Sequence, residues 1–255
     1  MQDKGIKETA FPRLINDGTP TLAGSVALVL VILLSLVALK IATTSSTNLP
    51  TEATLEFSWT DTSGEIQTGT VVIELYPDEA PIHVENFGLL ADEGKYDGSV
   101  FHRIISNFMM QGGDFTTGDG LGGHAAKFYG YCDGQESDNS ADCSPLSYTI
   151  PDEADNGLVH DPYVVSMAKK PNANTGGSQF FIVDPDAVGN DGTPGTPHLD
   201  GEHTVFGKVI DGFEHIDAIT SICDPQGYCV DDKTPQDVVL VSVTTNSGDP
   251  WWKFW

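Results

Sequence analysis

One arginine stands alone in the body of this chain. Apart from Arg13 near the N-terminus, Arg103 is the only arginine among the 255 residues, and it lies inside the apolar segment VFHRII at 100–105. A guanidinium group is always charged and holds several donors in a fixed plane. Such donors gain strength in apolar, water-poor surroundings. Arg103 is therefore either a functional donor or a strand residue whose charged end reaches solvent along an apolar surface. Its type and position alone leave both open.

The other side chains with catalytic potential show no metal-binding pattern. The seven histidines include no H-E-x-x-H spacing, and the four cysteines include no C-x-x-C spacing. Residues 128–147 are rich in carboxylates, but their spacing does not match an EF-hand loop, and a solvated acidic loop is expected there. We therefore predict no metal and no cofactor.

The chain is strongly acidic. It carries 37 Asp and Glu against 12 Lys and Arg, a formal net charge of −25. A surface of this sign repels phosphate backbones, so nucleic acid is not an expected partner. Solubility in a salty medium, where ions screen self-repulsion, accounts for the charge without a specific partner.

A membrane anchor is predicted near the N-terminus. Residues 22–39 form an uncharged, Leu- and Val-rich run that is long enough to cross a bilayer as a helix, and 40–42 extend it past Lys40. A cleaved signal peptide would have a shorter apolar region, and Lys40 lies close to the expected cleavage point. We therefore predict a retained single span over 22–42. Basic residues precede the span and an acidic sequence follows it, so 1–21 should be cytoplasmic and the rest extracytoplasmic.

The cysteines form two close pairs in loop-like segments, Cys132 with Cys143 and Cys223 with Cys229. Four cysteines allow three connectivities, and proximity along the chain favours the local one. In an oxidising compartment these bonds would staple two loops. Four reduced thiols are the alternative.

The periodicity after the anchor indicates a mainly β domain. A Thr/Ser linker at 43–51 precedes a folded domain over 52–246, and a Trp-rich tail occupies 247–255. Alternating apolar residues predict a hairpin from 55–59 and 70–76. Helical spacing predicts one helix that begins at Pro81 and is capped at its C-terminus by Gly94, and a second helix near 212–222. Shorter apolar runs between and after the helices complete a closed antiparallel barrel with helices covering its ends. These runs lie at 100–105, 108–111, 164–168, 179–183, 205–209 and 238–243.

Three long motifs in one order carry a family resemblance. They are FHRIISNFMMQGGDF at 101–115, GSQFFI at 177–182 and HLDGEHTVFG at 198–207. Together they resemble the cyclophilin family of peptidyl-prolyl cis-trans isomerases, over roughly residues 52–246. The resemblance implies an eight-stranded antiparallel barrel capped by two helices. It also implies proline-containing polypeptides as substrates, exported ones given the predicted topology.

The resemblance gives Arg103 a chemical role. A prolyl bond resists rotation because the nitrogen lone pair is delocalised, and a donor at that nitrogen would stabilise the twisted state. Gln111 would orient Arg103 and contact the substrate backbone. The proline pocket and peptide groove would be formed by Phe108, Met109, Ala168, Phe181, His198, Leu199 and His203. Without the resemblance, the apolar members of this set would be assigned to ordinary barrel core.

Some residues depart from the family pattern. His198 stands where many members have Trp, and Lys169 stands where an Asn usually follows Met-Ala, in a loop that is one residue longer. Lys169 is therefore not predicted as a site residue. Residues 128–147 form an insertion.

The functional alternatives are a non-catalytic peptide-binding module and, with no specific support, a surface adhesin. We expect a monomer. The tail, with three tryptophans in its last five residues, would dock on the domain or lie at the membrane interface.

Overall fold

The computed structural model describes residues 15–16, 19–20, 49–222 and 238–246. The chain divides into two units, Met1–Asn48 and Leu49–Trp255. In the first, the described part is one antiparallel pair, β1 (Ile15–Asn16) and β2 (Thr19–Pro20). The predicted anchor, the Cys223/Cys229 pair and the Trp-rich tail lie outside the described residues. No helix within the described ranges has both the length and the apolarity that a membrane span requires.

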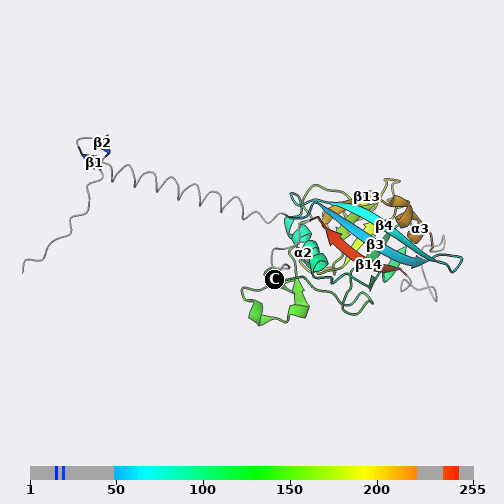
Figure 1. Ribbon diagram of the computed structural model, residues 1–255, viewed down its shortest axis with the longest axis horizontal. Helices are drawn as coiled ribbons and strands as arrows, with labels where there is room; N and C mark the ends of the chain where they lie inside the picture. Colours follow the sequence, from blue (N-terminus) through cyan, green and yellow to red (C-terminus); the bar gives the residue numbers. More distant parts are fainter. Residues whose placement is uncertain (1–14, 17–18, 21–48, 223–237, 247–255) are drawn as a thin grey trace, which may run out of the picture. The chain divides into compact units, whose positions relative to one another are not determined.

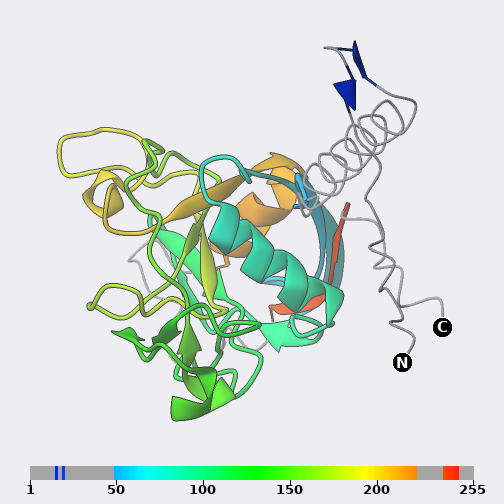
Figure 2. The same ribbon diagram turned by 90° about the vertical axis from the view of Figure 1, so that its left-hand side faces the viewer.

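The second unit is built around one curled antiparallel sheet (Figures 1 and 2). In spatial order its nine strands are β5 (Ser99–Val100), β14 (Val239–Thr245), β3 (Glu52–Thr60), β4 (Ile66–Leu75), β13 (Val205–Asp211), β11 (Val164–Met167), β12 (Phe180–Val183), β7 (Met109–Gly112) and β6 (Arg103–Ile105). The two outermost strands, β5 and β6, are consecutive pieces of one stretch of chain, interrupted at residues 101–102. The sheet therefore curls until both ends meet the same segment.

The predicted antiparallel sheet with two helices is thus confirmed. The strand count is nine rather than eight because the run at 100–105, predicted as one strand, is divided between β5 and β6. The hairpin follows its pattern closely: alternate residues of β3 are buried, and the turn is organised by Asp61, whose Oδ1 accepts hydrogen bonds from the amides of Ser63 (2.8 Å) and Glu65 (3.0 Å).

Helix α2 (Pro81–Asp92) begins at a proline, which has no amide hydrogen to leave unsatisfied at a helix start. The free amides of its first turn are capped by a residue distant in sequence: the carboxylate of Glu153 accepts from the amides of Ile82 (3.1 Å) and His83 (3.0 Å). The chain leaves the helix through Gly94, whose φ of +65° suits glycine. The predicted start and end of this helix are confirmed.

Helix α3 (Phe213–Thr220) confirms the second predicted helix. Its N-cap is Gly212, with φ +80°, where a Cβ would collide with the carbonyl oxygen of Thr70. Ile216 and Ile219 face the core. In Figure 2, α2 lies in front of the curled sheet and α3 behind it.

The buried apolar side chains divide into two clusters. The larger fills the interior of the sheet beneath both helices, and a smaller one lies on the other face of β7, β11, β12 and β13. Successive residues of a strand point to opposite faces. Accordingly Phe180 belongs to the larger cluster and Phe181 to the smaller, and Met110 and Met109 divide in the same way.

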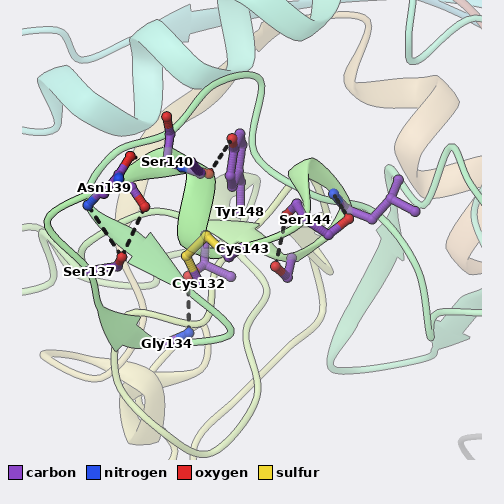
Figure 3. The surroundings of a disulfide bond; sticks show 12 residues. Cys132, Gly134, Ser137, Asn139, Ser140, Cys143, Ser144 and Tyr148 are labelled. Carbon is purple, nitrogen blue, oxygen red and sulfur yellow. Dashed lines mark hydrogen bonds between the residues drawn. A yellow bond between two sulfur atoms is a disulfide. The ribbon is translucent and has the colours of Figure 1, made fainter.

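The insertion at 128–147 has its own small structure. A three-stranded sheet has the order β10 (Tyr148–Thr149), β8 (Tyr131–Cys132), β9 (Gln135–Glu136), with short helices η1 (Ser140–Asp142) and η2 (Pro145–Ser147). Cys132 and Cys143 are disulfide-bonded (Figure 3), with Cα atoms 6.3 Å apart. This predicted pairing is confirmed. A third short helix, η3 (Pro197–Leu199), precedes β13.

Candidate active site

A pocket of about 230 Å³ opens over the smaller apolar cluster. It brings together eight of the nine residues predicted to bind or act on substrate, and adds Lys169. The lining residues are Arg103, Phe108, Met109, Gln111, Ala168, Lys169, Phe181, Leu199 and His203. The apolar members are therefore not part of the main core. They form the floor and walls of a separate site.

Strand register explains how distant residues meet here. Arg103 on β6 is directly opposite Gln111 on β7, and Gln111 is directly opposite Phe181 on β12. Residues opposite one another on adjacent strands share a face, with Cβ atoms about 5 Å apart. A charged donor, an amide and an aromatic ring thus form a row across three strands.

A chain of hydrogen bonds orients the arginine. Arg103 Nη1 donates to Gln111 Oε1 (3.3 Å), and Gln111 Nε2 donates to Gln179 Oε1 (2.9 Å). Gln179 Nε2 donates in turn to the carbonyl oxygens of Gly120 (3.0 Å) and Gly122 (2.7 Å). Because carbonyl oxygens can only accept, the Gln179 amide is held one way round, and this determines the orientation of Gln111. The result is an acceptor aimed at the guanidinium.

The loop that supplies these carbonyls is organised by Asp114. Its buried carboxylate accepts from the amides of Thr117 (3.1 Å), Gly120 (2.9 Å) and Gly122 (3.0 Å). Burial alone would raise the pKa of Asp114, but these hydrogen bonds hold it well below its usual range. The carboxylate therefore stays ionised, and the loop keeps its shape.

The aromatic floor is held from two sides. His160 stacks on Phe181, with ring centroids 5.9 Å apart and an interplanar angle of 11°, and His203 meets Phe181 edge-on at 5.7 Å. His203 Nδ1 lies 2.8 Å from the carbonyl oxygen of Met167, so Nδ1 carries the proton. The ring of His203 is thereby oriented at the pocket wall.

A Ser-His-Asp arrangement lies beneath this floor, but it is not placed for nucleophilic catalysis. His160 Nδ1 is 2.8 Å from Asp200 Oδ1, and its Nε2 is 2.9 Å from Ser166 Oγ. Ser166 is completely buried and also donates to the carbonyl oxygen of Thr204 (3.0 Å). Burial lowers the pKa of His160, against the raising effect of Asp200. The group supports Phe181 from below and has no access to substrate.

Phe108 forms the side of the pocket next to the arginine. The guanidinium carbon of Arg103 lies 5.6 Å from the centre of its ring. His198 stacks against the same ring, with centroids 5.7 Å apart, but does not line the pocket. The structure therefore places His198 behind a wall residue rather than at the cavity.

Two residues at the site were not predicted. Gln179 lies in the GSQFFI motif, but its part in orienting Gln111 depends on a loop 57 residues away in sequence. Lys169 follows Ala168 directly and was set aside because of the longer loop. Its side chain is only 7% exposed, and Nζ lies 3.4 Å from Asp152 Oδ2. No group of three or more potential metal ligands gathers anywhere in the described part of the chain.

Comparison with known proteins identifies the family. Residues 60–245 match the family described as cyclophilin type peptidyl-prolyl cis-trans isomerase/CLD. The chain is a member of the cyclophilin family. It is 40% identical over 153 residues to peptidyl-prolyl cis-trans isomerase-like 1 of Neurospora crassa, a match that covers 60% of this chain and 76% of that protein.

Other cyclophilin-type isomerases are also similar to this chain, but the match covers different shares of their length. Peptidyl-prolyl cis-trans isomerase 9 of Schizosaccharomyces pombe is 42% identical over 152 residues, which are 59% of this cyclophilin but 20% of that protein. A crystal structure of a Cryptosporidium parvum cyclophilin type isomerase superposes with a TM-score of 0.51 at 27% identity. It covers 76% of this chain and 98% of its own.

The orienting role of Gln179 can be tested directly. Gln179→Leu keeps a similar side-chain size but removes the oxygen that accepts from Gln111 and the nitrogen that donates to the loop carbonyls. Loss of one such hydrogen bond costs about 1.4 kcal/mol. We expect kcat/KM for a short X-Pro peptide to fall roughly tenfold, mostly through kcat. Gln67→Leu, in the exposed part of β4, is the matched control and should leave activity unchanged. Full activity of Gln179→Leu would show that Gln111 needs no such support.

Proposed function

We propose that this cyclophilin catalyses cis–trans isomerisation of X-Pro bonds in exported or surface polypeptides, and so assists their folding. The observation that carries the catalytic part is that one guanidinium, that of Arg103, lines a pocket of about 230 Å³ together with Phe108, Met109 and Phe181. The floor and walls suit a proline ring, and the oriented donor suits the prolyl nitrogen.

The chemistry requires no bond to be broken. The barrier of about 18–20 kcal/mol arises because the nitrogen lone pair is delocalised into the carbonyl. In the twisted state that lone pair is localised, so it can accept a hydrogen bond from Arg103. Gln111 keeps the guanidinium in position and offers its amide to the substrate backbone.

The magnitudes show that the donor does not act alone. A million-fold acceleration needs roughly 8 kcal/mol of differential stabilisation. One charged hydrogen bond supplies about 1.5–3 kcal/mol. The rest must come from pocket shape, with Phe108, Met109 and Phe181 fitting the twisted proline better than either planar isomer.

A non-catalytic peptide-binding module is the alternative. A binder gains from apolar walls, but it has no need of an arginine that lines the proline pocket and is oriented by hydrogen bonds through Gln111 and Gln179. The decisive experiment is a prolyl-isomerisation assay on the purified domain with a panel of X-Pro peptides. Catalytic exchange is expected, and peptide binding without acceleration would favour the alternative.

We further propose that the domain lies outside the cell membrane, held by a helix over 22–42. The uncharged run at 22–39, the basic residues before it and the acidic sequence after it support this topology. The Cys132–Cys143 bond is compatible with an oxidising compartment. We expect the protein to be a monomer.

The topology predicts a protease-accessibility result. Protease added to intact cells should remove the isomerase domain while an epitope placed before residue 22 stays protected. Mass spectrometry of protein from native membranes should find a Cys223–Cys229 bond beside Cys132–Cys143. A protected domain with four free thiols would contradict the proposed location, whereas activity would be unaffected by that outcome.

A further inference from the structure

A buried carboxylate lies close to the proline pocket without lining it. Asp184 directly follows β12 and is only 2% exposed. No basic group in the described part of the chain forms an ion pair with it. Burial raises the pKa of Asp184, and the charge of Asp186 adds to this rise, against hydrogen bonds that lower it. The ionised carboxylate is therefore less favourable in the folded protein than a neutral group of the same size, so stability alone does not account for it.

The turn at 106–108 determines where Phe108 lies. It joins β6, which carries Arg103, to β7. The amide of Phe108 donates to the carbonyl oxygen of Ile105 (3.1 Å). Asn107 has φ +60°, a left-handed conformation that is uncommon for residues other than glycine. Contacts from outside the turn are needed to hold this conformation, and the pocket wall follows it directly.

Asp184 holds this turn with both its backbone and its side chain. Its amide donates to the carbonyl oxygen of Phe108 (3.1 Å), which extends the ladder between β12 and β7 by one residue. Its carboxylate accepts a hydrogen bond from the amide of Asn107. The same carboxylate accepts from the amide of Asp186 (2.8 Å) and interacts with the hydroxyl of Thr220 on α3. One buried side chain thus ties the turn to a second loop and to a helix.

The protonation state of this side chain matters for the turn. An ionised carboxylate only accepts hydrogen bonds, whereas a protonated carboxyl, like the side-chain amide of asparagine, also carries a donor. With a donor in place of one acceptor, the amides of Asn107 and Asp186 compete for the acceptor oxygen that remains. Protonation of Asp184 therefore loosens the turn, and with it the wall that Phe108 gives to the pocket.

We propose that Asp184 is a positioning residue for the isomerase site, and that its ionised carboxylate keeps Phe108 at the wall of the proline pocket beside Arg103. It acts through the turn at 106–108 and has no need to contact substrate. This inference rests on the proposed isomerase function and adds to it a loss of activity in acid.

Other titratable groups surround the same region. Asp186 lies on the same loop, and Tyr163, just before β11, donates to Asp217 of α3 (2.8 Å). Burial, this hydrogen bond and the nearby carboxylates raise the pKa of Tyr163 to about 12, so its hydroxyl stays neutral in acid. On the pocket side, His198 stacks on Phe108. This histidine is the group best placed to imitate the effect, so the test must separate the two.

The pH profile of kcat/KM for a short X-Pro peptide tests the proposal. Wild-type activity should fall roughly fivefold, the scale of one hydrogen bond, as pH drops from neutral through the raised pKa of Asp184. Asp184→Asn should have the lower activity already at neutral pH and should lack that fall. Asp186→Asn should keep the neutral activity and move the fall to lower pH, because a neighbouring negative charge is removed. Asp191→Asn, at an exposed carboxylate farther along the loop, is the matched control and should keep the wild-type profile.

The melting temperature separates positioning from a purely structural role. A raised pKa means that the folded state binds the proton of Asp184 more tightly than the unfolded state does. The stability that this group contributes is therefore present at low pH and is lost as pH rises through the folded-state pKa. Asp184→Asn, which is neutral throughout, should melt at or above the wild-type temperature at neutral pH while its activity is lower. A melting temperature that falls together with activity would overturn the proposal.

The amide resonance of Asn107 gives a readout that does not depend on activity. In an NMR titration it should shift with the protonation of Asp184 in wild type and should not shift through that range in Asp184→Asn. A wild-type pH profile in Asp184→Asn would assign the effect to His198 and overturn the proposal, as would full activity of that variant at neutral pH. If no X-Pro peptide is isomerised at any pH, the proposed function fails instead. The Asn107 titration would still report on the turn, so the two failures are distinguishable.

Discussion

Arg103→Ala is expected to lower kcat/KM for X-Pro isomerisation by at least about a hundredfold, or roughly 2.7 kcal/mol. Among the described residues lining the proline pocket, Arg103 is the donor held by Gln111, and its guanidinium lies next to the Phe108 ring. Alanine removes the charged donor that would meet the prolyl nitrogen in the twisted state. Because the interaction is made only there, the loss should be in kcat rather than in KM.

Arg103→Lys is the informative companion. It keeps the positive charge but loses the planar fork that Gln111 orients. We expect it to recover only part of the lost activity. Arg103 is exposed, so both variants should melt close to wild type. Isomerisation kinetics and a thermal melt check both points, and near-wild-type activity of Arg103→Ala would remove the proposed mechanism.

The fold was predictable where one face of an element is polar. Alternation in β3 and the proline that begins α2 each leave a local signal, and both elements lie where expected. The division of the run at 100–105 between β5 and β6 left no such signal, because its two polar residues, His102 and Arg103, are consecutive and show no alternation. The anchor, the Cys223/Cys229 pair and the tail at 247–255 stay predictions.

The pocket was predictable only through the family resemblance. In β12 all four residues are buried, so alternation cannot show which of Phe180 and Phe181 faces the interior. Both faces of that strand are covered, one by the main core and the other by the pocket cluster. A pattern with no polar member carries no information on direction, and for this reason residue pattern alone assigned the pocket residues to the core.

The polar support of the site was beyond sequence reasoning for a different reason. The hydrogen-bond chain from Arg103 to Gln179 joins three segments and ends at backbone carbonyl oxygens of a loop. Every residue type has such a carbonyl, so the sequence does not mark these acceptors. The position of Lys169 depends on the path of a lengthened loop. His198 stacks on Phe108 and does not line the cavity, a placement that the motif around it does not reveal.

The separation of core and pocket leads to a second large expected effect, on stability. Phe180 is completely buried and meets the rings of Phe87, Tyr96 and Phe101 edge-on or near edge-on, at 5.6, 5.7 and 5.9 Å. Phe180→Ala removes these contacts and leaves a cavity, which costs about 3–5 kcal/mol. For a domain of this size the melting temperature should fall by about 6–20 °C.

Phe108→Ala should have the opposite effect, with a small loss of stability and a large loss of activity. Its side chain is only partly buried, at the pocket rather than in the core, so the melting temperature should change by a few degrees at most. The pocket wall beside Arg103 would be lost, and kcat/KM should fall roughly tenfold or more. Phe180→Ala, assayed well below its own melting temperature, should retain most of its activity, because Phe180 belongs to the main core cluster and does not line the proline pocket. The melting temperatures and activities of the two variants together test which strand face belongs to the core and which to the pocket. If Phe108→Ala melts as early as Phe180→Ala, the pocket cluster is part of the core after all, and the assignment of the two strand faces is wrong.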